Sequence, residues 1–266
     1  MNKSFLKWAG GKSSLLPLLK KIFQQYPSTR LVEPFLGSGV ISLNCEFDSY
    51  LVNDINPDIQ NLWNHLSDEL IEQTQLLFAM SSEADYYELR KRFNQLPYGF
   101  ERACLFIYLN RYCFNGLCRY NSKGGFNVPF GRYKKVYFPE TELKYCTSVA
   151  SKLNVQCKDF KDIFQQVQAD DVVYCDPPYY PISPTASFTN YSGLGFNLKE
   201  QEELAQCCED ARAKGAIVIV SNSDCEHTRR LYSSATLIEE VQVNRLISAN
   251  GNRNKANEII AIFEPM

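Results

Sequence analysis

The chain has 266 residues, 45% hydrophobic and 22% charged, so it can bury a full core and is not mainly disordered. A formal net charge of −2 excludes global attraction to nucleic acid, so any basic surface must be local. The ten cysteines form no C-x-x-C pair and the two histidines lack partners at zinc-ligand spacing, which predicts reduced core thiols and no metal site.

The N-terminus lacks the apolar segment and small-residue cleavage site of a secretory leader. No later stretch approaches 18 apolar residues. We therefore expect a cytoplasmic protein without membrane contact, and no feature predicts an obligatory protein partner.

The first strand and turn lie in residues 30–39, and a helical pattern follows over residues 40–44. Gly37 and Gly39 let the backbone pass close to a ligand, but Ser42 stands where a dinucleotide fingerprint has its third glycine. This argues against a pyrophosphate cradle. Glu33 places a negative charge at the strand tip, which indicates a cofactor that is positively charged there.

The second and third strands extend the same pattern. Residues 50–54 form a strand that ends in Asp54, about 20 residues after the first strand, where an acid is expected to hold ribose hydroxyls. A third strand covers residues 154–159, and Phe160 follows its end. Strands in this order indicate nucleoside binding.

A fourth strand in residues 171–176 runs into two prolines, which cannot continue a β-ladder. Its end therefore presents Asp176, the carbonyl of Pro177 and the ring of Tyr179 to the crevice at the sheet edge. The two acceptors and the aromatic face suit a planar ring with an exocyclic amino group. The alternative is an ordinary strand end with a tight turn, because Asp-Pro commonly opens turns.

The C-terminal part continues the α/β pattern. A helix is expected over residues 199–214 and a fifth strand over residues 216–222. Residues 239–248 and 257–263 read as two strands around a polar loop at 249–256, most simply an antiparallel pair at the sheet edge. The chain is therefore predicted to be an α/β protein with a mostly parallel sheet.

Residues 57–144 interrupt this pattern and are predicted to form an inserted domain, with residues 1–56 and 145–266 making the α/β domain. Helical patterns run over residues 58–80, 83–94 and 100–112. The stretch from 111 to 135 then contains no acidic residue but six basic ones: Arg111, Arg119, Lys123, Arg132, Lys134 and Lys135.

Aromatic residues alternate with these basic ones: Tyr112, Phe114, Tyr120, Phe126, Phe130, Tyr133 and, just beyond, Tyr137. A glycine turn at residues 123–125 lies between two strand-like runs, which predicts a β-hairpin. Basic and aromatic residues together are typical of surfaces that hold phosphates and contact bases. The alternative is a solvated charged face.

Three motifs together resemble the Dam-type DNA adenine-N6 methyltransferases: residues 5–12 (FLKWAGGK), residues 33–39 (EPFLGSG) and residues 176–179 (DPPY). The resemblance covers nearly the whole chain, including the long insertion. It implies the class I S-adenosylmethionine-dependent methyltransferase fold, with helices on both faces of the sheet, an antiparallel edge strand and an inserted DNA-recognition domain.

The resemblance also implies roles for individual residues around S-adenosylmethionine. Trp8 and Lys12 would cover its methionine end, Asp54 would hold the ribose, and Phe160 would face the adenine ring. Asp176 would lie between the cofactor and the target base. The remaining residues expected at this cofactor site are Glu33, Phe35, Gly37 and Gly39.

For double-stranded DNA, the resemblance implies the target GATC and a flipped adenine stacked on Tyr179. Arg119 would contact one guanine and Lys7 another. Other expected DNA contacts are Phe114 and Asn115, which would help open the duplex, Arg132 at a phosphate, and Leu117, Pro129 and Tyr133. Phe114 departs from the usual tyrosine, so a hydroxyl contact would be lost there while stacking remains.

The implied reaction is direct in-line methyl transfer, in which Asp176 and the Pro177 carbonyl accept the two hydrogens of adenine N6. No covalent intermediate is expected, because the sequence offers no activated cysteine and no histidine dyad. Residues 183–195 either close over the flipped base or form a plain loop. Rival functions are methylation of RNA adenine or of a protein amide, and a catalytically silent DNA-binding regulator.

Overall fold

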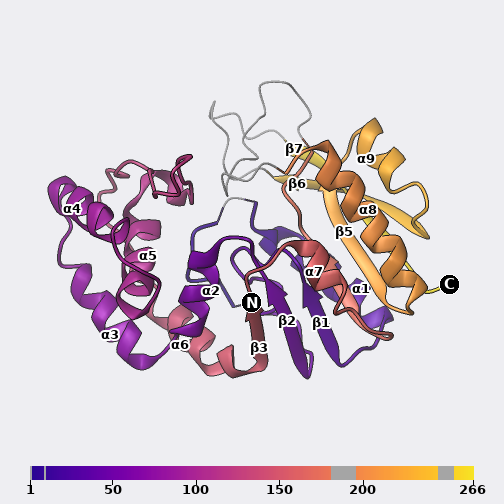
Figure 1. The fold of residues 1–266 in the computed structure, drawn as a ribbon, viewed down its shortest axis with the longest axis horizontal. Coiled ribbons are helices and arrows are strands. Elements are labelled where there is room, and N and C mark those ends of the chain that lie inside the picture. The colour runs from indigo at the N-terminus through magenta and orange to yellow at the C-terminus, as the bar shows by residue number, and fades with distance from the viewer. Residues whose placement is uncertain (1, 9, 181–195, 245–254) are drawn as a thin grey trace.

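A single seven-stranded sheet organises the protein in the computed structural model, which describes residues 2–8, 10–180, 196–244 and 255–266 (Figure 1). The strands are β1 (Arg30–Glu33), β2 (Ser49–Asn53), β3 (Leu153–Gln156), β4 (Val172–Cys175), β5 (Ile217–Ser223), β6 (Leu237–Asn244) and β7 (Lys255–Phe263). Their order is β3-β2-β1-β4-β5-β7-β6. The first five are parallel, and β7 pairs antiparallel with β5 and β6. The predicted parallel sheet with an antiparallel edge is confirmed.

Helices cover both faces of the sheet because successive strand residues point to opposite sides. Leu31 and Tyr174 face the core that contains α1 (Leu16–Gln25), where Phe23 packs edge-on against Tyr174 at 6.1 Å. Val32 and Val173 face the other core, beneath α7 (Phe160–Phe164) and α8 (Leu198–Ala213). The short helix α9 (Glu226–Leu231) lies beside α8 (Figure 1). The ends of the parallel strands are thus fixed from two sides.

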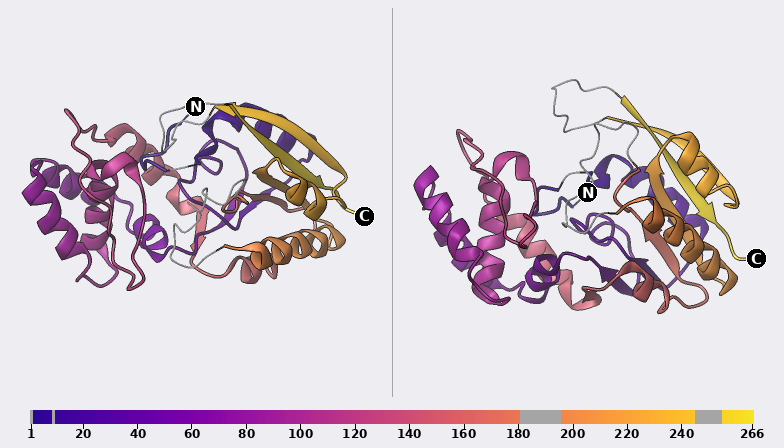
Figure 2. Two further views of the ribbon diagram at one scale, coloured as in Figure 1. Left: turned by 90° about the horizontal axis from the view of Figure 1, so that it is seen from above. Right: turned by 45° about the horizontal axis from the view of Figure 1, so that its top comes forward.

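The segment between β2 and β3 forms a helical lobe beside the sheet, and both views in Figure 2 show the two parts next to each other. Its helices are α2 (Pro57–Asn64), α3 (Asp68–Leu77), α4 (Glu83–Phe93), α5 (Phe100–Tyr112) and α6 (Glu140–Val149). Residues 102–112 of α5 are all buried, so α5 is the central helix of the lobe.

Two expectations about helices were wrong. Residues 58–80 form two helices, because the Ser67 side chain accepts a hydrogen bond from the Leu70 N–H and starts α3 there. Residues 40–44 form only helical turns, in which the Leu43 and Cys45 N–H groups donate to the carbonyls of Gly39 and Ile41.

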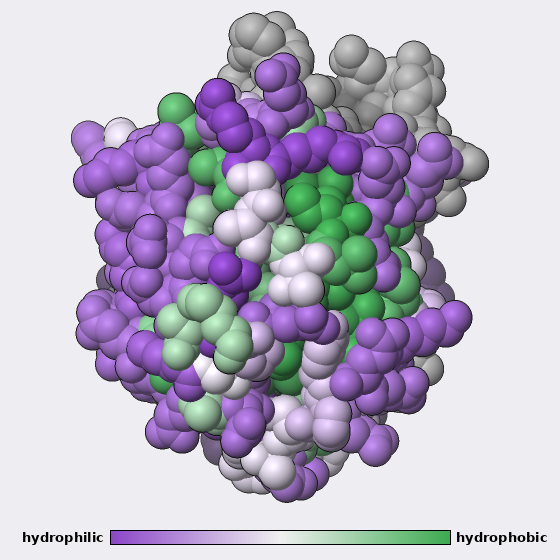
Figure 3. Space-filling view, turned by 90° about the vertical axis from the view of Figure 1, so that its right-hand side faces the viewer, coloured by the Kyte–Doolittle hydropathy of each residue, from purple (hydrophilic) through white to green (hydrophobic). Residues whose placement is uncertain are grey.

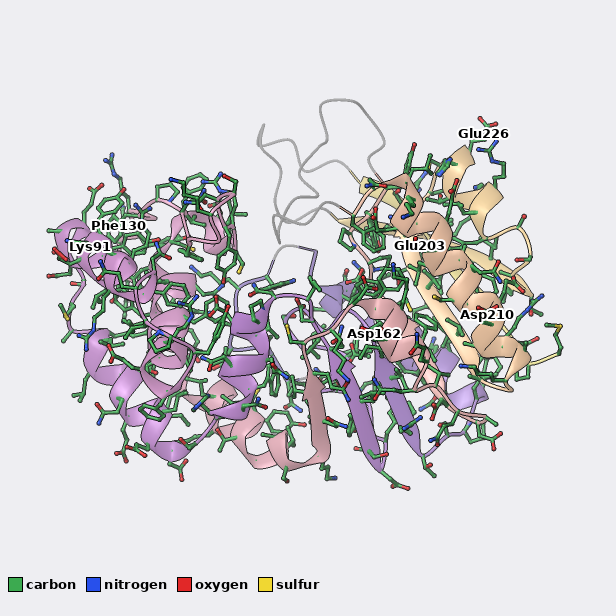
Figure 4. The ribbon with its side chains drawn as sticks, in the orientation of Figure 1. Lys91, Phe130, Asp162, Glu203, Asp210 and Glu226 are labelled. Atoms are coloured by element: carbon green, nitrogen blue, oxygen red, sulfur yellow. The ribbon has the colours of Figure 1, made fainter. Side chains whose placement is uncertain are left out.

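The expected β-hairpin after α5 is also not a regular ladder. Only isolated antiparallel bridges occur there, between Cys113 and Phe130 and between Tyr120 and Phe126. The side chain of Asn94, the residue after α4, hydrogen-bonds to the backbone of this segment instead. It accepts from the N–H of Phe126 at 2.8 Å and donates to the carbonyl of Phe126 at 3.1 Å. The loop is therefore attached to a helix, as Phe130 beside α4 illustrates in Figure 4.

The side of the molecule opposite the helical lobe is mainly hydrophilic, with a hydrophobic strip in its middle (Figure 3). Among the described residues, no helix is long and apolar enough to cross a membrane. Seven of the ten cysteines are buried: Cys45, Cys104, Cys113, Cys118, Cys146, Cys175 and Cys208.

Candidate active site

The candidate site lies at the carboxyl ends of the parallel strands, where an open α/β sheet forms its ligand crevice. Glu33 ends β1, Asp54 follows β2, Asp176 follows β4, and Asn222 lies near the end of β5. Strands β2, β1, β4 and β5 are consecutive neighbours, so these four side chains share one edge.

The glycine turn after β1 fits closely against Trp8. Gly37 has φ +52°, and a Cβ there would lie 2.7 Å from the Trp8 indole nitrogen. Gly39 has φ +70°, and its Cβ would lie 2.8 Å from the Trp63 ring. A side chain at either position is therefore excluded by backbone conformation and by space.

Asp54 organises the turn from the tip of β2. Its two carboxylate oxygens each accept a backbone N–H at 2.9 Å, one from Gly37 and one from Asn56. Burial raises the pKa of Asp54, and these two hydrogen bonds oppose that shift. Each oxygen retains a lone pair for a further donor, such as a ribose hydroxyl.

Glu33 is almost fully buried beneath the turn. The N–H of Ser42 donates to its carboxyl at 3.0 Å, and the Ser42 hydroxyl donates to the same oxygen. Burial raises the pKa of Glu33 to about 8, although the Ser42 bonds oppose the shift. In the sequence, Ser42 was noted only because it occupies the third glycine position of a dinucleotide fingerprint. Its contact with Glu33 was not predicted.

Three aromatic rings form a wall near the end of β3. Phe35 packs against Phe160 at a centroid distance of 5.6 Å and against Phe196 at 5.7 Å. Phe160 and Phe196 are also 5.7 Å apart. Phe35 and Phe160 were predicted here, whereas Phe196 was not, because it precedes α8 and is distant in sequence.

Asp176 is paired with Lys12, whose ammonium lies 2.9 Å from Oδ1 of the carboxylate. Lys12 is nearly buried, and its ammonium also donates to the Gly10 carbonyl at 2.9 Å. Burial raises the pKa of Asp176 to about 6, the Lys12 charge opposes this shift, and the charge of Glu258 adds to it. Among the described residues, Oδ2 accepts no hydrogen bond, so one carboxylate oxygen remains for a substrate N–H.

Tyr179 lies next to this ion pair. The Lys12 ammonium is 4.4 Å from the centre of its ring, and its hydroxyl donates to Glu258 of β7 at 2.8 Å. Gln201 of α8 donates to the Pro178 carbonyl at 2.8 Å, which fixes the turn. Tyr179 and Lys12 were predicted from the sequence, whereas Gln201 and Glu258 were not, because no local motif marks either one.

Lys7 of the N-terminal segment contacts Tyr133 in the loop after α5. The Lys7 ammonium lies 3.9 Å above the Tyr133 ring and donates to the Arg111 carbonyl at 3.1 Å. Burial and the neighbouring Arg111 charge lower the pKa of Lys7. A Cβ at Gly116 would lie 2.3 Å from the Lys7 Cβ, so this glycine allows the close approach.

The loop after α5 presents several of the predicted DNA contacts. Phe114 is 49% exposed, and its N–H donates to the Pro129 carbonyl at 2.8 Å. Asn115 is exposed with φ +54°, which turns the backbone sharply just after α5. Leu117 is half-buried, whereas Arg119 is exposed and donates to the Asn127 side chain at 2.8 Å.

One member of the basic stretch does not belong to its surface. Arg111 is buried and donates to the carbonyls of Tyr137 and Phe5 at 3.1 and 3.4 Å, so its inclusion in the basic surface was wrong. Arg132 lies 3.7 Å from Glu83, and its side chain is largely exposed. The basic residues that the loop presents to solvent, fully or in part, are Arg119, Lys123, Arg132, Lys134 and Lys135.

Within the described part of the chain, no group of three or more histidine, cysteine or acidic residues is arranged to hold a metal ion. Residues 183–195, considered as a closing loop, lie outside the described residues.

Known proteins are similar to this chain over nearly its whole length. A family model described as D12 class N6 adenine-specific DNA methyltransferase matches residues 8–246. A DNA adenine methylase of Vibrio cholerae is 47% identical, and the alignment covers 99% of this chain and 96% of that protein. DNA adenine methylases of Escherichia coli K12 and Serratia marcescens are 44% and 42% identical, with 99% and 98% of this chain covered and 96% and 98% of the respective relative.

Proposed function

The chain belongs to the D12 class of N6 adenine-specific DNA methyltransferases, and from that premise we propose that it methylates the adenine of GATC using S-adenosylmethionine. Its activity is that of an adenine-specific DNA methyltransferase. The proposal adds the methyl donor, the recognition sequence, the flipping of the target base and the role of each site residue.

The described residues fit the proposed methyl donor. Asp54 offers acceptors for ribose hydroxyls, and the aromatic wall of Phe35, Phe160 and Phe196 offers faces for an adenine ring. Glu33 supplies a buried carboxyl group beneath the turn, and a bound cation would favour its ionised form. When bound, S-adenosylmethionine supplies a methyl group that its positively charged sulfur has already activated.

Asp176 is suited to hold the target nitrogen. Its Oδ1 is bonded to Lys12, which leaves Oδ2 as the acceptor for one N6 hydrogen, and the Pro177 carbonyl is the proposed acceptor for the other. These two bonds favour a pyramidal nitrogen whose lone pair is aimed at the methyl group. Among the described cysteines near this edge, Cys175 is buried and its pKa is raised by burial, which argues against a thiolate nucleophile.

Flipping an adenine out of the duplex costs a few kcal/mol, which stacking on Tyr179 and insertion of Phe114 would offset. The exposure of Phe114 and Asn115 at the start of the loop after α5 supports this role. Arg119 and Lys7 are the proposed guanine contacts, and Arg132 is the proposed phosphate contact. Leu117, Pro129 and Tyr133 complete the proposed surface.

The observation that carries the proposal is the Lys12 and Asp176 ion pair at the strand edge that also holds Asp54. A DNA-binding regulator without activity needs no lysine-paired carboxylate at this edge with an oxygen that accepts no hydrogen bond from the described residues. No feature of the described residues specifically favours RNA adenine or a protein amide as the methyl acceptor.

The direct test is transfer of labelled methyl from S-adenosylmethionine to duplexes that contain GATC or a scrambled site, followed by nucleoside analysis. N6-methyladenine in the GATC duplex alone is expected, and equal labelling of both duplexes would refute the recognition sequence. Asp176→Ala should abolish transfer while circular dichroism and DNA affinity stay near those of the unmodified protein. Retained turnover would remove Asp176 from the proposed chemistry.

A further inference from the structure

A residue near the start of the last strand lies at the proposed active site. Strand β7 is antiparallel to β5, and Glu258 pairs with Ser223 at the end of β5. The N-terminal part of β7 therefore lies at the same sheet edge as the turn after β4. There Glu258 accepts a hydrogen bond of 2.8 Å from the hydroxyl of Tyr179, a residue 79 positions away in sequence.

The backbone on both sides of Tyr179 is already held by side chains. Gln201 donates to the carbonyl of Pro178, and Ser223 donates to the carbonyl of Tyr180, both at 2.8 Å. The Tyr180 N–H in turn donates to Asn222 at 3.1 Å. These bonds fix where the Tyr179 side chain starts, but they do not fix its two side-chain torsions.

The bond to Glu258 fixes the far end of the Tyr179 ring. Burial and nearby carboxylates raise the pKa of Tyr179 well above its ordinary value, so the phenol remains a hydrogen-bond donor at any working pH. A hydrogen bond from a neutral hydroxyl to a carboxylate is about twice as strong as one between neutral groups. The ring is therefore held at both ends.

We propose that Glu258 is a positioning residue for methyl transfer, which orients the Tyr179 ring for stacking on the target adenine by accepting its hydroxyl hydrogen bond. This inference rests on the proposed function, because it assumes that Tyr179 stacks on the flipped base. Glu258 itself need not touch DNA or cofactor.

A double-mutant cycle on single-turnover methyl transfer tests the proposal. Tyr179→Phe and Glu258→Ala each remove the same hydrogen bond, so each is expected to lower the rate about 10-fold, and the double variant no further. Glu258→Gln retains an acceptor oxygen and should restore most of the rate. The KM for the cofactor should stay unchanged in all variants.

Base flipping can be followed by fluorescence, and this signal would not change if Glu258 only stabilised the fold. With 2-aminopurine at the target position, Tyr179→Phe and Glu258→Ala should change the fluorescence of the bound duplex in the same way. The control is Tyr26→Phe with Glu264→Ala, a half-buried pair with the same chemistry and a 2.7 Å bond, which should leave rate and fluorescence unchanged.

Three outcomes separate this inference from the proposed function. Losses that multiply in the double variant would show that the two residues act independently and would overturn the inference. A normal rate in Tyr179→Phe would overturn it as well, even if Glu258→Ala failed to fold. A normal rate in Tyr179→Ala would instead refute the stacking role, and with it the proposed function of this residue.

Discussion

Replacing Lys12 by methionine isolates the electrostatic role of its ammonium, because methionine retains much of the side-chain length without the charge. The ammonium lies 2.9 Å from Asp176, and the two side chains are only 7% and 23% exposed, so solvent screens the pair weakly. Without it, burial acts unopposed and the pKa of Asp176 rises further.

The size of the effect follows from the ionisation of Asp176. A pKa of about 6 leaves roughly nine-tenths of the carboxyl ionised at pH 7. Loss of an adjacent opposite charge should move the acidic limb of the rate profile up by about 1 to 3 pH units. The rate at pH 7 should then fall about 2-fold to 90-fold and recover at higher pH.

The assay is methyl transfer with saturating cofactor and DNA below saturation, from pH 5 to 10, because that rate reports ionisations of the enzyme–cofactor complex and leaves out the pH dependence of cofactor binding. The other groups near Asp176, namely Glu33, Tyr174, Tyr179 and Glu258, are unchanged by the substitution. Lys12→Arg retains the positive charge, so the midpoint of the acidic limb of its rate profile should not change. A Lys12→Met profile with an unshifted midpoint would refute the argument, whatever its absolute rate.

Three further predictions test other parts of the molecule. Arg119→Ala should relax discrimination at one base pair of the site by about 1–3 kcal/mol, whereas an equal loss on every sequence would make Arg119 a phosphate contact. The pKa of Glu33 is about 8 without a cation, so cofactor affinity measured by calorimetry should rise from pH 6 to 8 and level off above. Glu33→Gln should flatten this pH dependence. A pH-independent affinity of the unmodified protein would contradict the prediction. Tyr120→Phe removes a 2.7 Å bond to the buried Asp58 and should lower the free energy of unfolding by about 1.5–3 kcal/mol in chemical denaturation. The same change at the exposed Tyr137 should have little effect, and equal losses at both would refute the role of burial.

Local sequence determined the parallel strands and the residues at their ends. Apolar strands that run into Pro34 or Pro177 must stop there, so the chain order alone assigns Glu33 and Asp176 to the sheet edge. Gly37 and Gly39 were predicted to let the backbone pass close to a ligand, which stays a prediction; in the structure the Trp8 and Trp63 rings lie against them. These features depend on neighbouring residues, which is why a single sequence reveals them.

The tertiary structure decided which distant groups meet. Asn94, directly after α4, hydrogen-bonds to the backbone of the loop after α5. The loop therefore forms isolated bridges and not the hairpin ladder that the sequence pattern predicts. Arg111 has the same charge as its exposed neighbours but is buried, since its guanidinium finds carbonyls from two other segments. Glu258 reaches Tyr179 only because β7 runs antiparallel to β5 and brings its first residues to the active-site edge. Residue type and periodicity encode the local backbone, whereas hydrogen-bond partners across the sheet depend on strand order, which no local pattern specifies.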